Sequence, residues 1–477
     1  MRINAARSRP RLLPALVALA TVLSACGGGG GSDGGGSGGG TSGTACSEAT
    51  RKQWVLDVTR EWYLFPETLP ATVNLGSYQT AEELLDALTA TARDQGKDRY
   101  FSYLTTRSAE NSLLGEGQFV GFGFRTRTDE GNRPFILDVF ESSPAIEAGL
   151  QRGDEIVAVD EGNGFVPVAQ SLVNGKTISD VLGPADAGVQ RGLRLLRGGS
   201  TLEVRMTKRT VTIDPVPDSF GVAVLPLDPA NPSVRVGYLH LRSYISTADP
   251  QLRDAFARLR AENLQYFIVD LRYNSGGLVS TAELIDNLLG GDRASADVQY
   301  RFVHNASKSS QNSTVRFQPQ SQSVKPVRIA FLTTDATASA SEITVNTMKP
   351  WVEVAIVGSN TLGKPVGQLA FDLSGCPDRL RLIAFKTVNA LGEGDYYEGL
   401  APTMRFACAA PDTLSAPMND PNDGLVRGAR DWLATGTCNA LIAAQFDGQA
   451  KTSPGSATPY PRPLQPSAAE HWLPGIH

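Results

Sequence analysis

Apolar segments that alternate with helical stretches constrain this chain more than any other feature of its sequence. The apolar segments lie at residues 236–244, 266–271, 328–335 and 352–358. Amphipathic or small-residue stretches follow three of them, at residues 249–262, 278–289 and 336–349. Strands that alternate with helices predict a sheet with crossover connections, because a parallel partner strand can be reached only through a long return segment. We therefore expect an α/β core with crossover βα units.

Periodicity and composition divide the rest of the chain. Apolar residues recur at helical spacing in residues 48–63 and 81–92, which predicts a small helical region. Short strand-like runs between glycine-containing turns follow it. The prediction is a multidomain α+β protein with a helical N-terminal domain at 46–114, a second small domain at 115–213, the α/β core at 214–440, and a Pro/Ser-rich tail at 441–477 that is mobile from 451 onward.

The first residues have the pattern of an export signal. Arginines precede an apolar run at residues 12–23, which is too short to span a membrane, and Leu-Ser-Ala then leads to Cys26. This order resembles a bacterial lipobox, so residues 1–25 are expected to be a lipoprotein signal peptide and Cys26 a lipidated residue. Residues 26–45 are rich in Gly and Ser and predict a flexible tether. We expect a lipid-anchored envelope protein, with Gly27 favouring the outer membrane, facing the periplasm.

The charge balance excludes some classes of partner. Without the four arginines of residues 1–25, 40 basic residues face 49 acidic ones, a net charge of −9. A chain this acidic is not expected to bind nucleic acid or an anionic membrane surface.

Four cysteines remain after Cys26. An even number in an exported chain predicts two disulfides, with three pairings open. Our expected pairing is Cys376–Cys408 with Cys46–Cys438. The cysteine spacings do not resemble a zinc site, and the chain has only four histidines, so neither a metal nor another cofactor is expected.

Ser339 and Lys364 are the candidates for chemistry. Ser339 lies in a turn of small residues between an apolar strand and a helix start, where a hydroxyl can be exposed in front of a helix N-terminus. Lys364 lies in the loop after the next apolar strand, where desolvation would lower its pKa and leave the amine partly neutral, as a general base must be. Together the two residues predict a serine–lysine dyad and amide hydrolysis.

A structural interpretation of the same residues stays open at this point. Ser339 and Glu342 have the spacing of a helix capping box, in which the serine is the N-cap. A lone lysine in a loop is most often a solvated surface charge.

Residues 115–213 resemble a PDZ domain over nearly their full length. The resemblance is carried by Gly121, Phe122, Gly123 and Phe124, followed at PDZ spacing by Ser-Pro-Ala, Ala-Gly-Leu and Gly-Asp-Glu-Ile between residues 143 and 156. It implies that residues 121–124 bind the end of a peptide through main-chain N–H groups. It also implies that a sheet edge accepts the peptide as an added strand.

Together with this domain, three further matches give the chain a wider resemblance. They are Gly237 to Leu241 (Gly-Tyr-Leu-His-Leu), Asp270 to Gly277 (Asp-Leu-Arg-Tyr-Asn-Ser-Gly-Gly), and Ser339 to Glu342 with Gly363-Lys364 and Gln368. With them, residues 114–368 resemble the C-terminal processing (tail-specific) peptidases, a family of PDZ-containing serine–lysine peptidases.

The resemblance implies roles for individual residues. Ser339 would be the nucleophile, Lys364 the general base and Gln368 the residue that orients the amine, whereas Ser341 would be structural. Some members have an assisting aspartate eleven residues after the serine, but Pro350 stands there, which favours the Ser–Lys–Gln arrangement.

The same resemblance implies an oxyanion hole and a class of substrate. The main chain of Ala340, with Gly276 or Gly277, would bind the oxyanion. The PDZ domain would capture or gate unfolded or tail-exposed proteins that end in small apolar residues. An adaptor or self-association is left open.

Three alternative functions can be compared with the same sequence features. An inactive PDZ scaffold that only binds peptides would need the same second domain. A serine–histidine hydrolase would use His240 as its base, although a histidine in a predicted buried strand is more often a core residue. A purely structural lipoprotein would explain neither the dyad spacing nor the glycine pair.

Overall fold

The computed structural model describes residues 46–228, 230–441, 462 and 466–477. The predicted signal peptide, the lipidation site at Cys26 and the Gly/Ser-rich tether lie outside the described residues. Within the described part of the chain, no helix combines the length and the apolar character that a membrane span needs.

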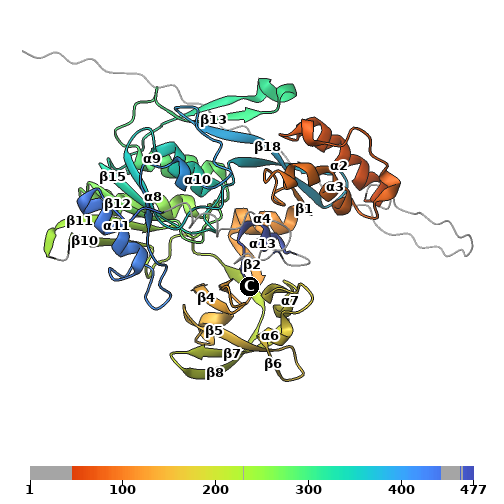
Figure 1. Ribbon diagram of the computed structural model, residues 1–477, viewed down its shortest axis with the longest axis horizontal. Helices are drawn as coiled ribbons and strands as arrows, with labels where there is room; N and C mark the ends of the chain where they lie inside the picture. Colours follow the sequence, from red (N-terminus) through yellow and green to blue (C-terminus); the bar gives the residue numbers. More distant parts are fainter. Residues whose placement is uncertain (1–45, 229, 442–461, 463–465) are drawn as a thin grey trace, which may run out of the picture. The chain divides into compact units, whose positions relative to one another are not determined.

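A mixed sheet forms the core (Figure 1). Its strands, in spatial order, are β10 (Val222–Asp228), β11 (Asn231–His240), β12 (Tyr266–Asp270), β15 (Arg328–Thr333), β16 (Glu353–Gly358) and β19 (Ala407–Ala409). All neighbours from β11 to β19 pair in parallel, and β10 pairs antiparallel to β11. The predicted α/β core with crossover connections is therefore confirmed.

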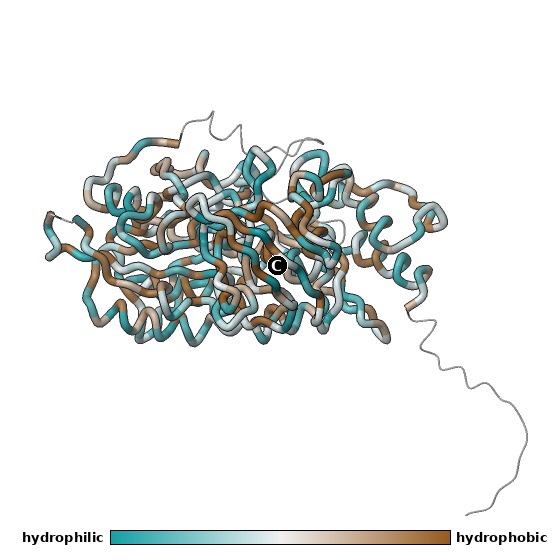
Figure 2. Tube along the Cα trace, turned by 90° about the horizontal axis from the view of Figure 1, so that it is seen from below, coloured by the Kyte–Doolittle hydropathy of each residue, from teal (hydrophilic) through white to brown (hydrophobic). Residues whose placement is uncertain are grey.

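Helices cover both faces of this sheet, which explains why its central strands β12, β15 and β16 are buried and mostly apolar. The helices are α8 (Ala248–Ala261), α9 (Val279–Leu289), α10 (Ala340–Met348) and α11 (Gly424–Thr435). Residues of α8, α9 and α10, such as Phe256, Ile285 and Val345, share one hydrophobic cluster, and residues of α11, such as Trp432, belong to another. Hydrophobic stretches accordingly run through the interior of the chain trace in Figure 2.

A second, antiparallel sheet lies next to the N-terminal helices. It contains β1 (Tyr103–Thr106), β18 (Asp378–Asn389), β13 (Val298–His304) and β14 (Ser313–Arg316), with β17 (Val366–Asp372) also paired to β18. Short 3-10 helices occur at η1 (Pro66–Thr68), η2 (Leu75–Ser77), η3 (Ala306–Gln311) and η4 (Ala401–Thr403).

The predicted N-terminal helices are confirmed as α2 (Glu48–Trp62) and α3 (Ala81–Asp94), followed by α4 (Arg107–Glu116). They do not form a core of their own. Leu84 and Leu88 of α3 share a buried cluster with Leu380 and Leu382 of β18. The apolar face of these helices is therefore covered by the second sheet, and the helices depend on this sheet for part of their buried contacts.

Residues 118–212 fold around a separate hydrophobic cluster, and we call them the β-domain. Their elements are β2 (Gln118–Gly121), β3 (Phe124–Thr128), β4 (Pro134–Val139), α5 (Pro144–Glu147), β5 (Glu155–Asp160), β6 (Phe165–Pro167), α6 (Val168–Ser171), α7 (Ile178–Leu182), β7 (Gln190–Arg197), β8 (Ser200–Thr207) and β9 (Arg209–Thr212). Strand β3 lies at one end of the main sheet, in the order β3-β4-β5-β7-β8. The buried Arg242 of the core donates to both carboxylate oxygens of Asp138, at 2.7 and 2.9 Å, and so joins the β-domain to the core.

The end of the chain differs from the predicted mobile tail. Residues Ala468–Trp472 form helix α13, and the end marked C in Figure 1 lies beside the β-domain. Trp472, Leu473 and Ile476 belong to a buried cluster that also contains Phe119 and Val211 of the β-domain. The prediction was based on the overall Pro/Ser content of the tail and did not consider these few apolar side chains. In the folded chain they pack against apolar residues of the β-domain.

The predicted disulfide pairing is wrong. The disulfides join Cys46 to Cys376 and Cys408 to Cys438, with Cα–Cα distances of 5.3 and 5.5 Å. The first pairing follows from the packing of α2 on β18, which brings the start of α2 to the turn before β18. The second follows from β19, because Cys408 forms a β-bridge with residue 440. Both contacts are tertiary, so sequence spacing alone could not distinguish the three pairings.

We expect the Cys408–Cys438 disulfide to contribute measurably to stability. Replacing both cysteines by serine (Cys408→Ser with Cys438→Ser) opens a loop with a sequence separation of 30 residues. A loop of this size should cost about 2 to 4 kcal/mol in the free energy of unfolding, measured by urea denaturation under non-reducing conditions. Peptide mapping of the unreduced protein tests the pairing itself, and a Cys376–Cys408 peptide would contradict it.

Candidate active site

Ser339 lies between the end of β15 and the first residue of α10. Its backbone has φ 56° and ψ −118°, a positive φ that residues other than glycine rarely adopt. An ordinary N-cap serine has a β-region backbone instead. A strained serine in a strand–turn–helix connection is typical of a nucleophile turn, which holds the hydroxyl at the edge of the sheet.

Gly276 approaches this turn closely, whereas Gly277 lies against the main chain of Tyr244. A Cβ atom on Gly276 would lie 2.8 Å from the Ser339 Cβ and 2.7 Å from the Ala340 nitrogen, so only glycine fits here. The Gly276 N–H donates to the Asn274 Oδ1 at 2.9 Å, and the Asn274 carbonyl accepts from the Ser341 hydroxyl at 2.8 Å. The structure therefore brings Gly276 against Ser339 and Ala340, and Asn274 fixes the two segments relative to each other.

The buried Glu342 joins the serine turn to the lysine loop. Its Oε2 accepts from the N–H groups of Ser339 and Lys364, at 2.9 and 2.8 Å. Its Oε1 accepts from the Gly363 N–H at 2.8 Å and from the Thr361 hydroxyl at 2.5 Å. Burial raises the pKa of this carboxyl, and its four donors oppose that rise. One side chain thus holds the main chain of both dyad candidates.

The Lys364 amine lies in a largely desolvated place. Its Nζ donates to the Gln368 Oε1 at 3.2 Å and lies 4.8 Å from the centre of the Phe101 ring. Burial lowers the pKa of Lys364 to about 8, whereas the negative charges of Asp98 and Glu342 act in the opposite direction. A substantial share of this amine is therefore neutral near pH 8, as a general base requires.

The N-terminal region supplies one wall of this site. Asp98 accepts from the Phe101 N–H at 2.8 Å and shapes the loop that carries Arg99 and Phe101. Arg99 Nη2 donates to the Gly363 carbonyl at 2.5 Å, and Gln368 Nε2 donates to the Phe101 carbonyl. Sequence reasoning missed Asp98, Arg99 and Phe101, because they lie more than 200 residues before the dyad and outside every motif that we used.

The remaining candidates lie elsewhere. Gly121, Phe122, Gly123 and Phe124 belong to the β-domain, at the end of β2 and the start of β3, and the N–H groups of Gly123 and Phe124 contact the end of the chain. His240 is buried in β11, with its Nδ1 3.6 Å from the Asp270 Oδ2. Within the described residues, neither ring nitrogen of His240 has a hydrogen-bond partner.

Comparison with known proteins assigns two parts of the chain to family models. Residues 235–405 match the model of Peptidase family S41, and residues 51–103 match the model of the Peptidase S41 N-terminal domain. The first match contains Ser339, Glu342 and Lys364, and the second contains the loop of Asp98 and Phe101. The β-domain lies between the two matched ranges.

Similar proteins agree with these family models. The chain is 27% identical over 261 residues to a carboxyl-terminal-processing protease of Synechocystis sp., which covers 54% of this chain and 56% of that protein. It is 30% identical over 323 residues to a chloroplastic C-terminal processing peptidase of Tetradesmus obliquus, which covers 66% of this chain and 64% of that protein. The chain therefore spans less than two thirds of the length of either relative.

A solved structure resembles the fold. A crystal structure of a protein described as an S41 protease from Bacteroides fragilis has a TM-score of 0.62 and 23% identity, and the match covers 80% of this chain and 97% of that chain. At this level of identity, the likeness concerns the fold alone.

We expect Glu342→Gln to destabilise the protein. The glutamine side chain has one acceptor oxygen, whereas the carboxylate has two. The two donors that now bond to one of the carboxylate oxygens would therefore face an NH₂ group and lose their acceptor. The free energy of unfolding should fall by about 2 to 3 kcal/mol in urea denaturation. Glu262→Gln is the matched control, because this glutamate pairs with Arg235 at the surface and its loss should cost less than about 1 kcal/mol. Equal losses of unfolding free energy in the two variants would contradict the conclusion that Glu342 joins the serine turn to the lysine loop.

Proposed function

We propose that the chain, of which residues 51–103 and 235–405 match models of peptidase family S41, is a serine endopeptidase that cleaves proteins recognised by their C-terminal tails. Its relatives are named as C-terminal processing proteases. The single observation that carries the proposal is the Glu342 carboxylate, whose Oε2 accepts from the N–H groups of both Ser339 and Lys364. This shared acceptor ties a strained serine to a lysine with a lowered pKa.

In the proposed mechanism, Lys364 is the general base. Its neutral amine takes the proton from the Ser339 hydroxyl, whose oxygen attacks the carbonyl carbon of the scissile peptide bond. The amine then returns the proton to the leaving nitrogen, which leaves an acyl-enzyme. Water attacks this ester with help from the same amine and regenerates the serine.

The main chain around the serine would bind the oxyanion. The Ala340 N–H is at the N-terminus of α10, where no intrahelical acceptor exists for it. The Gly276 N–H already donates to Asn274, so we assign the second donor to Gly277. Donors held in place by the fold stabilise the developing negative charge without reorganisation, often by several kcal/mol.

Gln368 would position the lysine amine. Its Nε2 donates to the Phe101 carbonyl, which orients the Oε1 toward the Lys364 Nζ. The oxygen therefore accepts from the amine and limits its rotation. Gln368 adds no charge, so it orients Lys364 without raising the pKa of the amine as a carboxylate would.

The β-domain would act as a PDZ-type peptide-binding domain. Strand β3 ends the main sheet of this domain, and the N–H groups of Gly123 and Phe124 contact a main-chain oxygen there. A sheet edge with such donors can accept an extended tail as an added strand. We further propose that Cys26 anchors the chain in the bacterial envelope, at the outer membrane facing the periplasm, and that the substrates are unfolded or tail-exposed proteins with apolar C-terminal residues.

Ser339→Ala and Lys364→Ala should each abolish proteolysis. The loss should be at least about a thousandfold in the rate of cleavage of an unfolded protein with a free, apolar C-terminus, followed by mass. Ser341→Ala is the matched control, because this hydroxyl donates to Asn274 and would cost only about 1 kcal/mol of stability. Activity that survives Lys364→Ala but not a His240 substitution would assign the base to histidine.

The pH dependence of cleavage tests the base independently. Because the pKa of Lys364 is lowered to about 8, the neutral amine becomes abundant as the pH rises through that value, and kcat/KM should rise with a midpoint near pH 8. Gln368→Glu would place a negative charge beside the amine and should move the midpoint to higher pH by about one unit or more. Gln311→Glu, at an exposed glutamine, should leave it unchanged. A midpoint near pH 6.5 would point to histidine instead.

A further inference from the structure

The last residues of the chain pair with strand β3 of the β-domain. The N–H groups of Gly123 and Phe124 donate to the His477 main-chain oxygen, at 2.7 and 3.3 Å. The His477 N–H donates to the Phe124 carbonyl at 2.9 Å, and the Thr126 N–H donates to the Gly475 carbonyl at 2.8 Å. This is an antiparallel strand added to the edge of β3 that β4 does not use. Such an addition is the way in which an extended peptide binds to a sheet edge.

The His477 side chain enters the space between β3 and α7. Its Nε2 lies 2.7 Å from the Thr126 hydroxyl, and its Nδ1 lies 3.4 Å from the Ser179 hydroxyl. The ring is 5.4 Å from that of Phe124. Burial lowers the pKa of His477 to about 3, so the docked imidazole is neutral and can both donate and accept. Each polar atom of this side chain therefore meets a hydroxyl of the groove.

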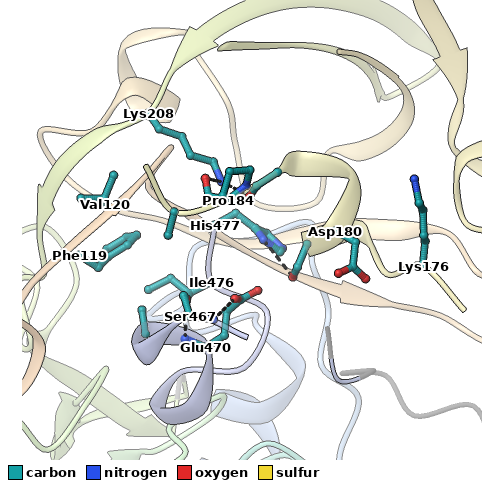
Figure 3. A pocket seen from close by; sticks show the side chains of 14 residues that line it. Phe119, Val120, Lys176, Asp180, Pro184, Lys208, Ser467, Glu470, Ile476 and His477 are labelled. Atoms are coloured by element: carbon teal, nitrogen blue, oxygen red, sulfur yellow. Dashed lines mark hydrogen bonds between the residues drawn. The ribbon is translucent and has the colours of Figure 1, made fainter. Parts of the chain in front are cut away.

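Open space remains beside this contact. Figure 3 shows His477 and Ile476 at a pocket. The volume of this pocket is about 430 Å³. Lys176, Asp180 and Lys208 contribute to its wall from the β-domain. Figure 3 also shows Ser467 and Glu470 of the end segment at the same pocket, so the β-domain and the segment enclose it together. A cavity of this size leaves room for side chains larger than those that now occupy the groove.

The same segment also contacts the candidate active site. The Ser275 hydroxyl, directly before Gly276, donates to the Trp472 carbonyl. The Lys364 Nζ lies 6.0 Å from the centre of the Trp472 ring, and the Trp472 Nε1 donates to Glu110 at 3.2 Å. Only four residues lie between Trp472 and His477. One short stretch of chain therefore touches the lysine, the glycine loop and the peptide groove.

We propose that residues 467–477 are the resident ligand of the β-domain groove, and that a substrate tail must displace them before it can be delivered to Ser339. The edge of β3 can pair with one added strand at a time, so the segment and a substrate tail compete for the same N–H and carbonyl groups. The proposed competition for the groove is supported by the contacts described above. The effect of this competition on cleavage also rests on the proposed function.

Covalent attachment makes this competition strong. A tethered ligand acts at an effective concentration that often reaches the millimolar range, so a free tail of similar intrinsic affinity displaces it poorly. A tail that forms the same main-chain hydrogen bonds and also fills the neighbouring pocket would displace it more readily. The preferred ligand is therefore an extended tail that pairs with the main chain of β3 and places a side chain in this pocket.

Peptide binding tests the proposal without proteolysis. All chains carry Ser339→Ala, so that no peptide is cut, and the probe is a fluorescent peptide with the sequence of residues 466–477. Fluorescence anisotropy should show binding at least about ten times tighter in an otherwise complete chain with Ile476→Asp and His477→Ala than in the parent, because these changes release the segment. Equal binding by the two chains, or no binding by the released chain at an unchanged Tm, would overturn the proposal.

A groove variant keeps the test independent of the segment variant. In the released chain, Thr126→Val should weaken peptide binding about three- to tenfold, the value of one neutral hydrogen bond. Thr128→Val, two residues along β3, should leave it unchanged. Equal effects of the two threonine changes would contradict the assigned groove. If the parent chain bound the peptide more tightly on dilution, the segment in the groove would come from a second copy of the chain. That result would contradict the assignment of the groove to the chain's own end.

Cleavage assays separate this proposal from the proposed function. With Ser339 restored, the released chain should cleave a tail-bearing unfolded protein several times faster than the parent, and added peptide should slow it again. Absence of cleavage in both chains, with tight peptide binding only by the released one, would contradict the peptidase function and leave the resident ligand supported. Equal cleavage rates together with that difference in binding would overturn the inhibitory role of the segment.

Discussion

The carboxylate of Glu342 is the interaction on which the candidate active site depends. It is buried, and it accepts hydrogen bonds from the serine turn on one side and from the lysine loop on both oxygens. A buried carboxylate without such donors would be costly, so the two loops and the side chain stabilise one another. The strained backbone of Ser339 persists because this network and the close approach of Gly276 determine its conformation.

The environment of Lys364 links the site to distant parts of the chain. Phe101 lies against its amine, and Arg99 of the same loop donates to the Gly363 carbonyl. The N-terminal helices therefore pack on β18 for a reason beyond stability, since they bring an aromatic wall to the lysine. Removal of this wall would rehydrate the amine and return its pKa toward that of a free lysine.

The β-domain and the end of the chain form a second level of organisation. Ion pairs such as that of Arg242 and Asp138 fix the β-domain to the core. The end segment lies across both, with Trp472 near Lys364 and His477 in the groove. In the competition that we propose, a tail that displaces this segment from the groove would also move Trp472 away from Lys364, so occupancy of the groove and access to the site would be coupled.

Local patterns in the sequence were enough to predict the main elements and to select the dyad candidates. Apolar strands followed by helices predicted the parallel sheet, and the turn of small residues at Ser339 predicted the position of a candidate nucleophile, because both signals are local. The role of Glu342 was only partly visible, as a capping residue. The wall at Phe101, the disulfide partners and the docked end segment were decided by tertiary structure alone. Each joins residues far apart in the chain, and their contacts depend on which surfaces the folded sheets leave uncovered.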